Sequence, residues 1–139
     1  MTDIATTARA FFDACETGQG WAACAPFCTP DATFAAQAEP LAEVKTLQAY
    51  CDWMTMICGL MPDARYELRA WAEDADRHCV IAFAVFHGTH TGAGGPVPPT
   101  GRSVQTDYVY ARTFTGEKIS HMTKVWNASW AMRALGWAD

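Results

Sequence analysis

The spacing of apolar residues over the first sixty positions predicts three helices. The first runs from about Asp3 to Thr17 and stops before Gly18. A short second helix is expected at residues 21–25, before Pro26. The third, over residues 47–61, carries a broad apolar stripe and ends at Pro62. The stripe consists of Leu47, Tyr50, Cys51, Met54, Ile57, Cys58 and Met61.

Patterns typical of strands fill most of the remaining chain. A short strand is expected at residues 32–36, and residues 65–70 alternate between polar and apolar. Residues 79–87 are apolar on both faces, which indicates a central strand. Residues 104–114 and 118–128 form a hairpin around Thr115-Gly116, and the glycine- and proline-rich residues 92–101 form a loop. Helices followed by antiparallel strands predict an α+β fold, with residues 1–139 as a single domain.

The register of the hairpin decides which side chains share a face. If Thr115 pairs with Lys118, uninterrupted pairing places Val109 opposite Lys124 and Asp107 opposite Trp126. One face then carries Asp107, Val109, Ala111, Met122, Lys124 and Trp126, and the other carries Tyr108, Tyr110 and Arg112. A slip of one residue would exchange the two faces of a strand.

Four short segments carry a resemblance to a known family. They are Gly88–Gly92 (GTHTG), Pro98–Gly101 (PPTG), Met61–Tyr66 (MPDARY) and Thr29–Phe34 (TPDATF). With these segments the chain resembles the SnoaL-like branch of the NTF2-like superfamily over almost its whole length. The resemblance implies an NTF2-like, cystatin-like cone, in which three N-terminal helices pack on a curved, mainly antiparallel sheet around one central pocket.

The resemblance also implies a class of chemistry. SnoaL-like polyketide cyclases close a carbon ring by acid–base catalysis without a cofactor, and an aspartate of the last strand is the catalytic acid or base. Lys124 stands at that position here. A lysine acts as a base only when burial depresses its pKa. We therefore expect a protein that binds a small, largely apolar organic molecule in the cone pocket, either as a cofactor-independent isomerase or cyclase or as a non-catalytic NTF2-like binding or dimerisation module.

The candidate site follows from the predicted hairpin face and from the third helix, which the resemblance implies lies as a lid on the curved sheet. The catalytic candidates are Asp107, Lys124 and His90, and the substrate-binding candidates are Trp126, Met122, Trp53, Met54 and Val109. Two alternatives stay open: Asp107 and Lys124 as a structural ion pair, and His90 as a residue that shapes its loop. The apolar tail of Trp130, Met132, Leu135 and Trp137 would close the pocket mouth or reach a partner subunit.

Composition limits the partners. Half of the residues are hydrophobic and only 18% are charged, which indicates a further buried surface, such as a ligand pocket or a homodimer interface. The net charge of −5 comes without a basic stripe, so we expect no nucleic-acid partner. No apolar run is long enough to span a membrane, and none has the form of a signal peptide. We expect a cytoplasmic protein with no membrane partner.

The six cysteines lie within apolar segments and form no C-x-x-C pair. Free cysteine packs as a small hydrophobic residue, whereas structural zinc ligands usually come in tighter pairs. We expect six reduced core thiols, no metal site and no cofactor.

Overall fold

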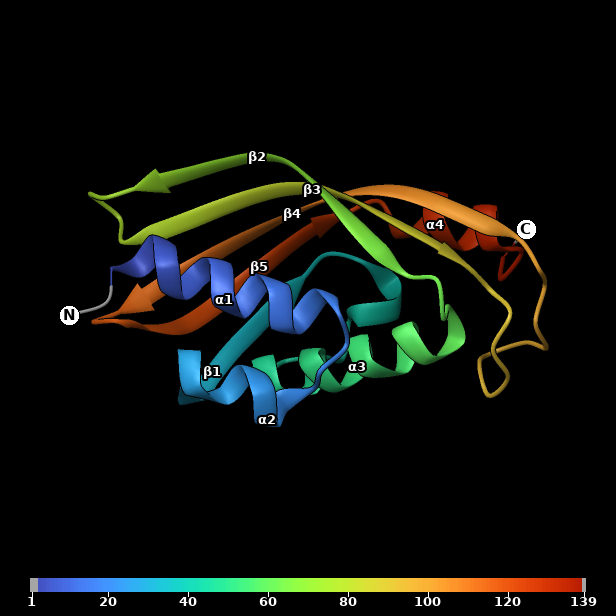
Figure 1. The fold of residues 1–139 in the computed structure, drawn as a ribbon, viewed down its shortest axis with the longest axis horizontal. Helices are drawn as coiled ribbons and strands as arrows, with labels where there is room; N and C mark the ends of the chain where they lie inside the picture. Colours follow the sequence, from blue (N-terminus) through green and yellow to red (C-terminus); the bar gives the residue numbers. More distant parts are fainter. Residues whose placement is uncertain (1–2, 139) are drawn as a thin grey trace.

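A five-stranded sheet and four α-helices make up the described part of the chain, residues 3–138 of a computed structural model (Figure 1). The helices are α1 (Ile4–Glu16), α2 (Trp21–Cys24), α3 (Leu47–Leu60) and α4 (Ala128–Leu135). The strands are β1 (Cys28–Ala36), β2 (Arg65–Asp74), β3 (Cys79–Thr89), β4 (Ser103–Thr115) and β5 (Lys118–Trp126). Short 3-10 turns lie at Ala25–Phe27 and Glu39–Leu41. The predicted α+β class is confirmed.

Side-chain caps fix where three of the helices begin. Asp3 accepts a hydrogen bond from the backbone N–H of Thr6 at 2.8 Å, and Thr46 starts α3 in the same way. Asn127 caps α4, which Gly136 ends in the left-handed conformation at φ 76°. Three helices were predicted, and α4 was expected only as an apolar tail. This segment forms a fourth helix, which begins after Asn127 and ends before Gly136.

The strand order is β1-β5-β4-β3-β2, in which β1 runs parallel to β5 and every other neighbouring pair is antiparallel. The sheet is curved, and α1, α2 and α3 lie on one side of it (Figure 1). Helix α4 lies near the end of the sheet opposite the N-terminus (Figure 1). The side of the sheet that faces α1 and α3 is called the inner face below.

The core fills the space between α1, α3 and the inner face. Phe11 and Phe12 of α1 are fully buried, as are Tyr110 of β4 and Met122 of β5. The phenyl ring of Phe12 meets the ring of Tyr110 edge-on, with centroids 5.6 Å apart. The inner face is therefore lined by large aromatic side chains as well as aliphatic ones.

The predicted hairpin register is wrong from Thr113 onward. Thr115 pairs with Lys118 as expected, but a bulge leaves Ser120 unpaired, and Thr113 then pairs with His121. Tyr110 consequently lies opposite Lys124, and Tyr108 lies opposite Trp126. The two tyrosines and Arg112 point into the core, whereas Asp107 and Val109 belong to the outer face.

The loop between β3 and β4 is docked onto the end of α3. The backbone N–H of Gly92 donates to the carbonyl oxygen of Leu60 at 2.9 Å. A Cβ at Gly92 would lie only 2.3 Å from the carbonyl oxygen of Gly59, so no larger residue fits this contact. Within the part of the chain that the structure describes, no helix has the length and apolarity needed to cross a lipid bilayer.

Candidate functional site

A small cavity lies between the inner face, α3 and α4. Its walls are mostly apolar, and two charged side chains, Glu16 and Lys124, reach them. The apolar lining comprises Trp53, Met54, Ile57, Met61, Phe86, Val104, Trp126, Ala131, Met132, Leu135 and Trp137. The volume is about 30 Å³, the space of roughly two water molecules at about 10–15 Å³ each. A larger ligand therefore requires the walls to move.

Glu16, the last residue of α1, is the buried acid of this site and is 2% exposed. Tyr108 donates a hydrogen bond to its Oε2 at 2.7 Å, and Tyr110 donates to its Oε1. Burial raises the pKa of the Glu16 carboxyl, and the charge of Lys124 and the two tyrosine hydroxyls act in the opposite direction. The C-terminal end of a helix also disfavours a negative charge.

Lys124 of β5 is the buried base of the site and is 6% exposed. Its Nζ donates a hydrogen bond to the Tyr50 hydroxyl at 3.0 Å. It also lies 4.3 Å from the ring centroid of Trp126 and 5.1 Å from that of Trp53, within the range of cation–π contacts. Burial lowers the pKa of Lys124 to about 8, against the opposing charge of Glu16.

Tyrosine hydroxyls join these two groups into one chain of hydrogen bonds. Lys124 contacts Tyr50, Tyr50 contacts Tyr110, and Tyr110 contacts Glu16, which also accepts from Tyr108. Burial raises the pKa of all three tyrosines, so their hydroxyls keep their protons near neutral pH. The chain can therefore pass a proton between a buried amine and a buried carboxyl group.

The structure brings together half of the predicted site residues. Lys124, Trp126, Trp53 and Met54 all line the cavity. Met122 is on the same face of β5 but is fully buried in the core, outside the lining. Whether any of these residues contacts a ligand stays a prediction.

The predicted placement of Asp107 and Val109 beside Lys124 is wrong. The bulge at Ser120 turns both residues to the outer face, where Asp107 is exposed and Val109 is half-buried. The alternative of an Asp107–Lys124 ion pair fails for the same reason. The acid that shares the cavity with Lys124 is Glu16, which comes from the other end of the chain.

His90 is buried in the loop after β3 and does not reach the cavity itself. Its Nδ1 accepts a hydrogen bond from the indole N–H of Trp137 at 2.9 Å and a longer one from the backbone of Thr100 at 3.4 Å. Trp137 lines the cavity. His90 thus joins its own loop, through Thr100, to the C-terminal wall of the cavity, through Trp137. These contacts fit the alternative that it shapes its loop, and a catalytic role stays a prediction.

Four residues of the network were not predicted: Glu16, Tyr50, Tyr108 and Tyr110. Glu16 directly precedes the Thr17-Gly18 helix stop, and an acid at that position is usually solvated. Tyr50 did fall within the predicted apolar stripe of α3, and its burial follows from that spacing. The two tyrosines of β4 could be assigned to this face only with the bulge in place.

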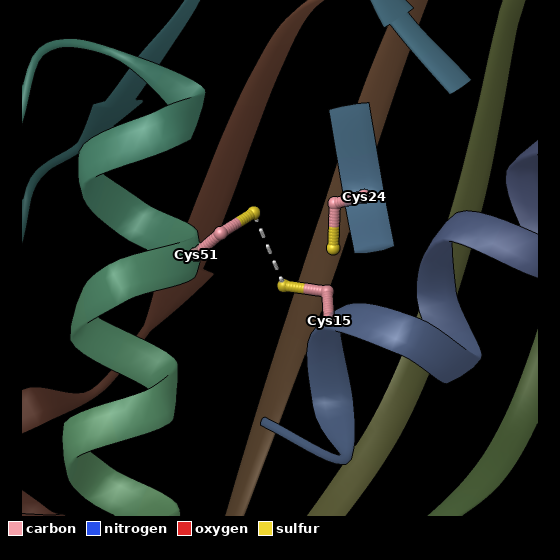
Figure 2. A group of neighbouring side chains, drawn as sticks. All are labelled: Cys15, Cys24 and Cys51. Carbon is pink, nitrogen blue, oxygen red and sulfur yellow. Dashed lines mark hydrogen bonds between the residues drawn. The ribbon is translucent and has the colours of Figure 1, made fainter. Parts of the chain in front are cut away.

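Three thiols from the first half of the chain lie close together in the core. The Sγ atoms of Cys15, Cys24 and Cys51 all lie within 4.8 Å of one another, and those of Cys15 and Cys51 are 4.0 Å apart (Figure 2). Each comes from a different helix, and all three are buried. Among residues 3–138 this is the one group of three or more side chains placed to share a metal ion, and it offers three of the four ligands that structural zinc takes.

Comparison with known proteins places this architecture in a family. The sequence model of the SnoaL-like domain matches residues 8–122. Among curated proteins, no sequence matches. A proposed SnoaL-like polyketide cyclase from Jannaschia sp. CCS1 superposes with a TM-score of 0.76 at 15% identity, over 100% of this chain and 98% of that one.

Two Streptomyces proteins are similar to the chain in the same way. IdmH, a proposed polyketide cyclase from Streptomyces antibioticus, gives a TM-score of 0.74 at 17% identity, over 97% of this chain and 99% of that one. AclR, a proposed hydroxylase from Streptomyces galilaeus, gives a TM-score of 0.75 at 18% identity, over 96% of this chain and 85% of that one. Identities this low show a shared fold and not a shared reaction. The family match and the NTF2-like, cystatin-like fold agree, and the chain belongs to the SnoaL-like domain family.

Proposed function

We propose that the protein binds a small, largely apolar organic molecule in the cavity and catalyses a proton transfer on it, as a cofactor-independent isomerase or cyclase. One observation carries the proposal: a buried acid and a buried base, joined by tyrosine hydroxyls, both reach a mostly apolar cavity. The polyketide cyclases among the structural neighbours are compatible with this class of reaction.

The two charged groups have complementary roles in this proposal. Glu16, whose pKa burial raises, takes a proton from a carbon next to a carbonyl group. The ammonium form of Lys124 faces the oxygen on which negative charge develops. Tyr108 and Tyr110 hold the Glu16 carboxylate in place, and Tyr50 holds the amine of Lys124. The apolar walls strengthen these interactions because they exclude water.

The proposal is tested by hydrogen exchange at carbon. Cyclic ketones from cyclopentanone to 2-tetralone are incubated with the protein in D2O, and the loss of the α C–H signal is followed by NMR. We expect the wild type to exchange the α hydrogen faster than buffer alone does. The protein-catalysed rate should fall at least about 100-fold in Glu16→Gln, because this change removes the general base. Asp107→Asn is the matched control, since this acid lies on the outer face, and it should exchange like the wild type. No exchange above buffer with any ketone would contradict the catalytic role.

A second function, a non-catalytic binding module, is favoured by one specific observation. Lys124 occupies the strand position where the resemblance to the cyclases implies an aspartate, and an amine cannot replace a carboxylate directly. Binding of the same ketones without exchange would identify this function.

We also propose that the protein works as a homodimer in the cytoplasm. The apolar row of Phe83, Val109 and Val125 on the outer face of the sheet supports the dimer. Six free cysteines support a reducing compartment, since thiols persist there.

A further inference from the structure

The surroundings of Lys124 differ from those of an ordinary buried lysine in one respect. Such a lysine pairs with a carboxylate, whereas among residues 3–138 the Lys124 Nζ makes its one hydrogen bond to the Tyr50 hydroxyl. Glu16 acts on it as a charge and through the tyrosines. The amine also borders the cavity, so a bound molecule can reach it when the walls move.

These features are those of a lysine that acts as a nucleophile. An amine attacks carbon only in its neutral form, and an apolar pocket favours that form. The lowered pKa of Lys124, about 8, leaves a usable fraction neutral near pH 7, in contrast to an exposed lysine. The aromatic faces of Trp126 and Trp53 then stabilise a positive charge that stays on the nitrogen after reaction.

We propose that Lys124 forms an imine with an apolar aldehyde or ketone bound in the cavity. This inference rests on the proposed function, because it takes the ligand of that cavity to be a carbonyl compound. It adds a covalent step at a residue that the proposed function uses only as a charge.

The step balances without an oxidant or a reductant. Lys124 first loses one ammonium proton through the Tyr50 and Tyr110 hydroxyls to Glu16. The nitrogen lone pair then attacks the carbonyl carbon, a C–N bond forms, the carbonyl π bond breaks, and the oxygen takes that proton from Glu16 to give a carbinolamine. The nitrogen passes a second proton along the same chain to Glu16, which gives it to the hydroxyl group. The C–O bond then breaks and water leaves. The product is a protonated imine, whose charge lies among the aromatic rings and near Glu16.

The tyrosine chain gives Lys124 a route for proton transfer during imine formation. The other lysines in the sequence, Lys45 and Lys118, provide a comparison. Both of those are exposed to solvent, whereas Lys124 is buried. Neither borders the cavity. They provide an internal comparison within the same molecule.

The experiment traps the imine with benzaldehyde and sodium cyanoborohydride, which reduces it to a stable benzylamine. The full-length protein is treated at pH 7.5, and the adduct is located by peptide mass spectrometry. We expect one benzyl group on Lys124, formed at least about tenfold faster than on Lys45 or Lys118. Lys45→Arg should keep the rapid adduct, and Lys124→Arg, which preserves the positive charge, should lose it. Equal or slower labelling of Lys124 would overturn the inference.

A parallel measurement separates this inference from the proposed function. Benzyl alcohol has the same ring but no carbonyl group, and its binding is followed by ligand-observed NMR. Benzyl alcohol that binds the cavity, together with benzaldehyde that binds but leaves Lys124 unlabelled, would overturn the imine and leave the proposed function standing. Rapid labelling of Lys124 with no ketone exchange in D2O would support the imine and contradict the proton-transfer role.

Discussion

Lys124 is subject to opposing physical effects at a single atom. Burial favours the neutral amine, whereas the charge of Glu16 and the aromatic faces favour the ammonium. The outcome is a pKa lowered from 10.5 to about 8. A lowered pKa in the folded state means that folding releases protons, so the effect on stability depends on pH.

This linkage predicts a specific pH dependence. The contribution of Lys124 to stability is fully present above pH 10.5 and is lost as the pH falls through about 8, because the unfolded state binds the proton more tightly. The wild type should therefore gain stability relative to Lys124→Met between about pH 8 and 10.5. The difference between the two pKa values corresponds to roughly 3 kcal/mol over the whole interval. Urea unfolding of both proteins from pH 7 to 9.5 measures the part of this gain between pH 8 and 9.5, roughly 2 kcal/mol.

Two controls make this comparison specific. The same pair of proteins in a Glu16→Gln background removes the second buried titrating group, and the gain should persist. Lys45→Met changes an exposed lysine, and its free energy of unfolding plotted against pH should run parallel to that of the wild type. Parallel curves for the wild type and Lys124→Met would show that Lys124 titrates as it does in the unfolded chain.

Single residues also show where sequence reasoning is sufficient. Lys124 could be assigned to one face with Trp126 because side chains alternate along a strand. Trp53 and Met54 could be assigned because the resemblance implies that the third helix covers the curved sheet. Glu16 could not, since its burial depends on two tyrosines almost a hundred positions later. A local pattern carries no information on such a partner.

At the level of elements, one bulge accounts for the error in the predicted site. The turn at Thr115 and the start of the pairing were predicted correctly, and the extra residue Ser120 then shifted every later pair by one. Side chains alternate along a strand, so this shift exchanges the two faces of β4 and moves Asp107 outward. The pattern of hydrophobic residues favours neither register, because Val109 suits an inner face as well as Tyr108 and Tyr110 do.

The helices α1, α2 and α3 meet at the thiol cluster of Cys15, Cys24 and Cys51 (Figure 2). We expect this cluster to pack as apolar core with reduced, metal-free thiols, because three buried thiolates without a fourth zinc ligand would leave uncompensated charge. Protein purified under reducing conditions and dialysed against a chelator should hold less than about 0.1 equivalent of zinc or copper by elemental analysis. All six thiols should react with a thiol reagent after unfolding.

The matched variant for this prediction is Cys15→Ala. It should destabilise the protein by about 1 kcal/mol, the scale of a small core truncation, with or without added zinc. One equivalent of metal that survives the chelator and is lost in Cys15→Ala would contradict the prediction.

On the scale of the whole molecule, the outer face of the sheet carries exposed apolar side chains that could form an interface between two copies of the chain. Phe83, Val109 and Val125 are paired across β3, β4 and β5 and form one continuous row. Phe83 is 36% exposed and Val125 is 62% exposed, and Trp130 of α4 is 58% exposed near the same face. The sequence favoured a homodimer interface through its apolar composition, and this row gives that interface a specific place on the outer face, since Tyr108 and Tyr110 point inward.

A contiguous apolar row on a sheet favours an interface in which the same face of a second copy covers it. We expect a homodimer that buries about 1,500 Å² in total. Light scattering at micromolar concentration should report twice the 15.2 kDa mass of the chain.

Val109→Asp, at the centre of the row, should weaken association roughly 30-fold or more, because it buries an unpaired carboxylate. Thr115→Asp, at the exposed hairpin tip, is the matched control and should stay dimeric. A wild-type mass of 15.2 kDa would contradict the dimer, whereas a shift confined to Val109→Asp would locate the interface on the face opposite the cavity, with both cavities free to admit their ligands.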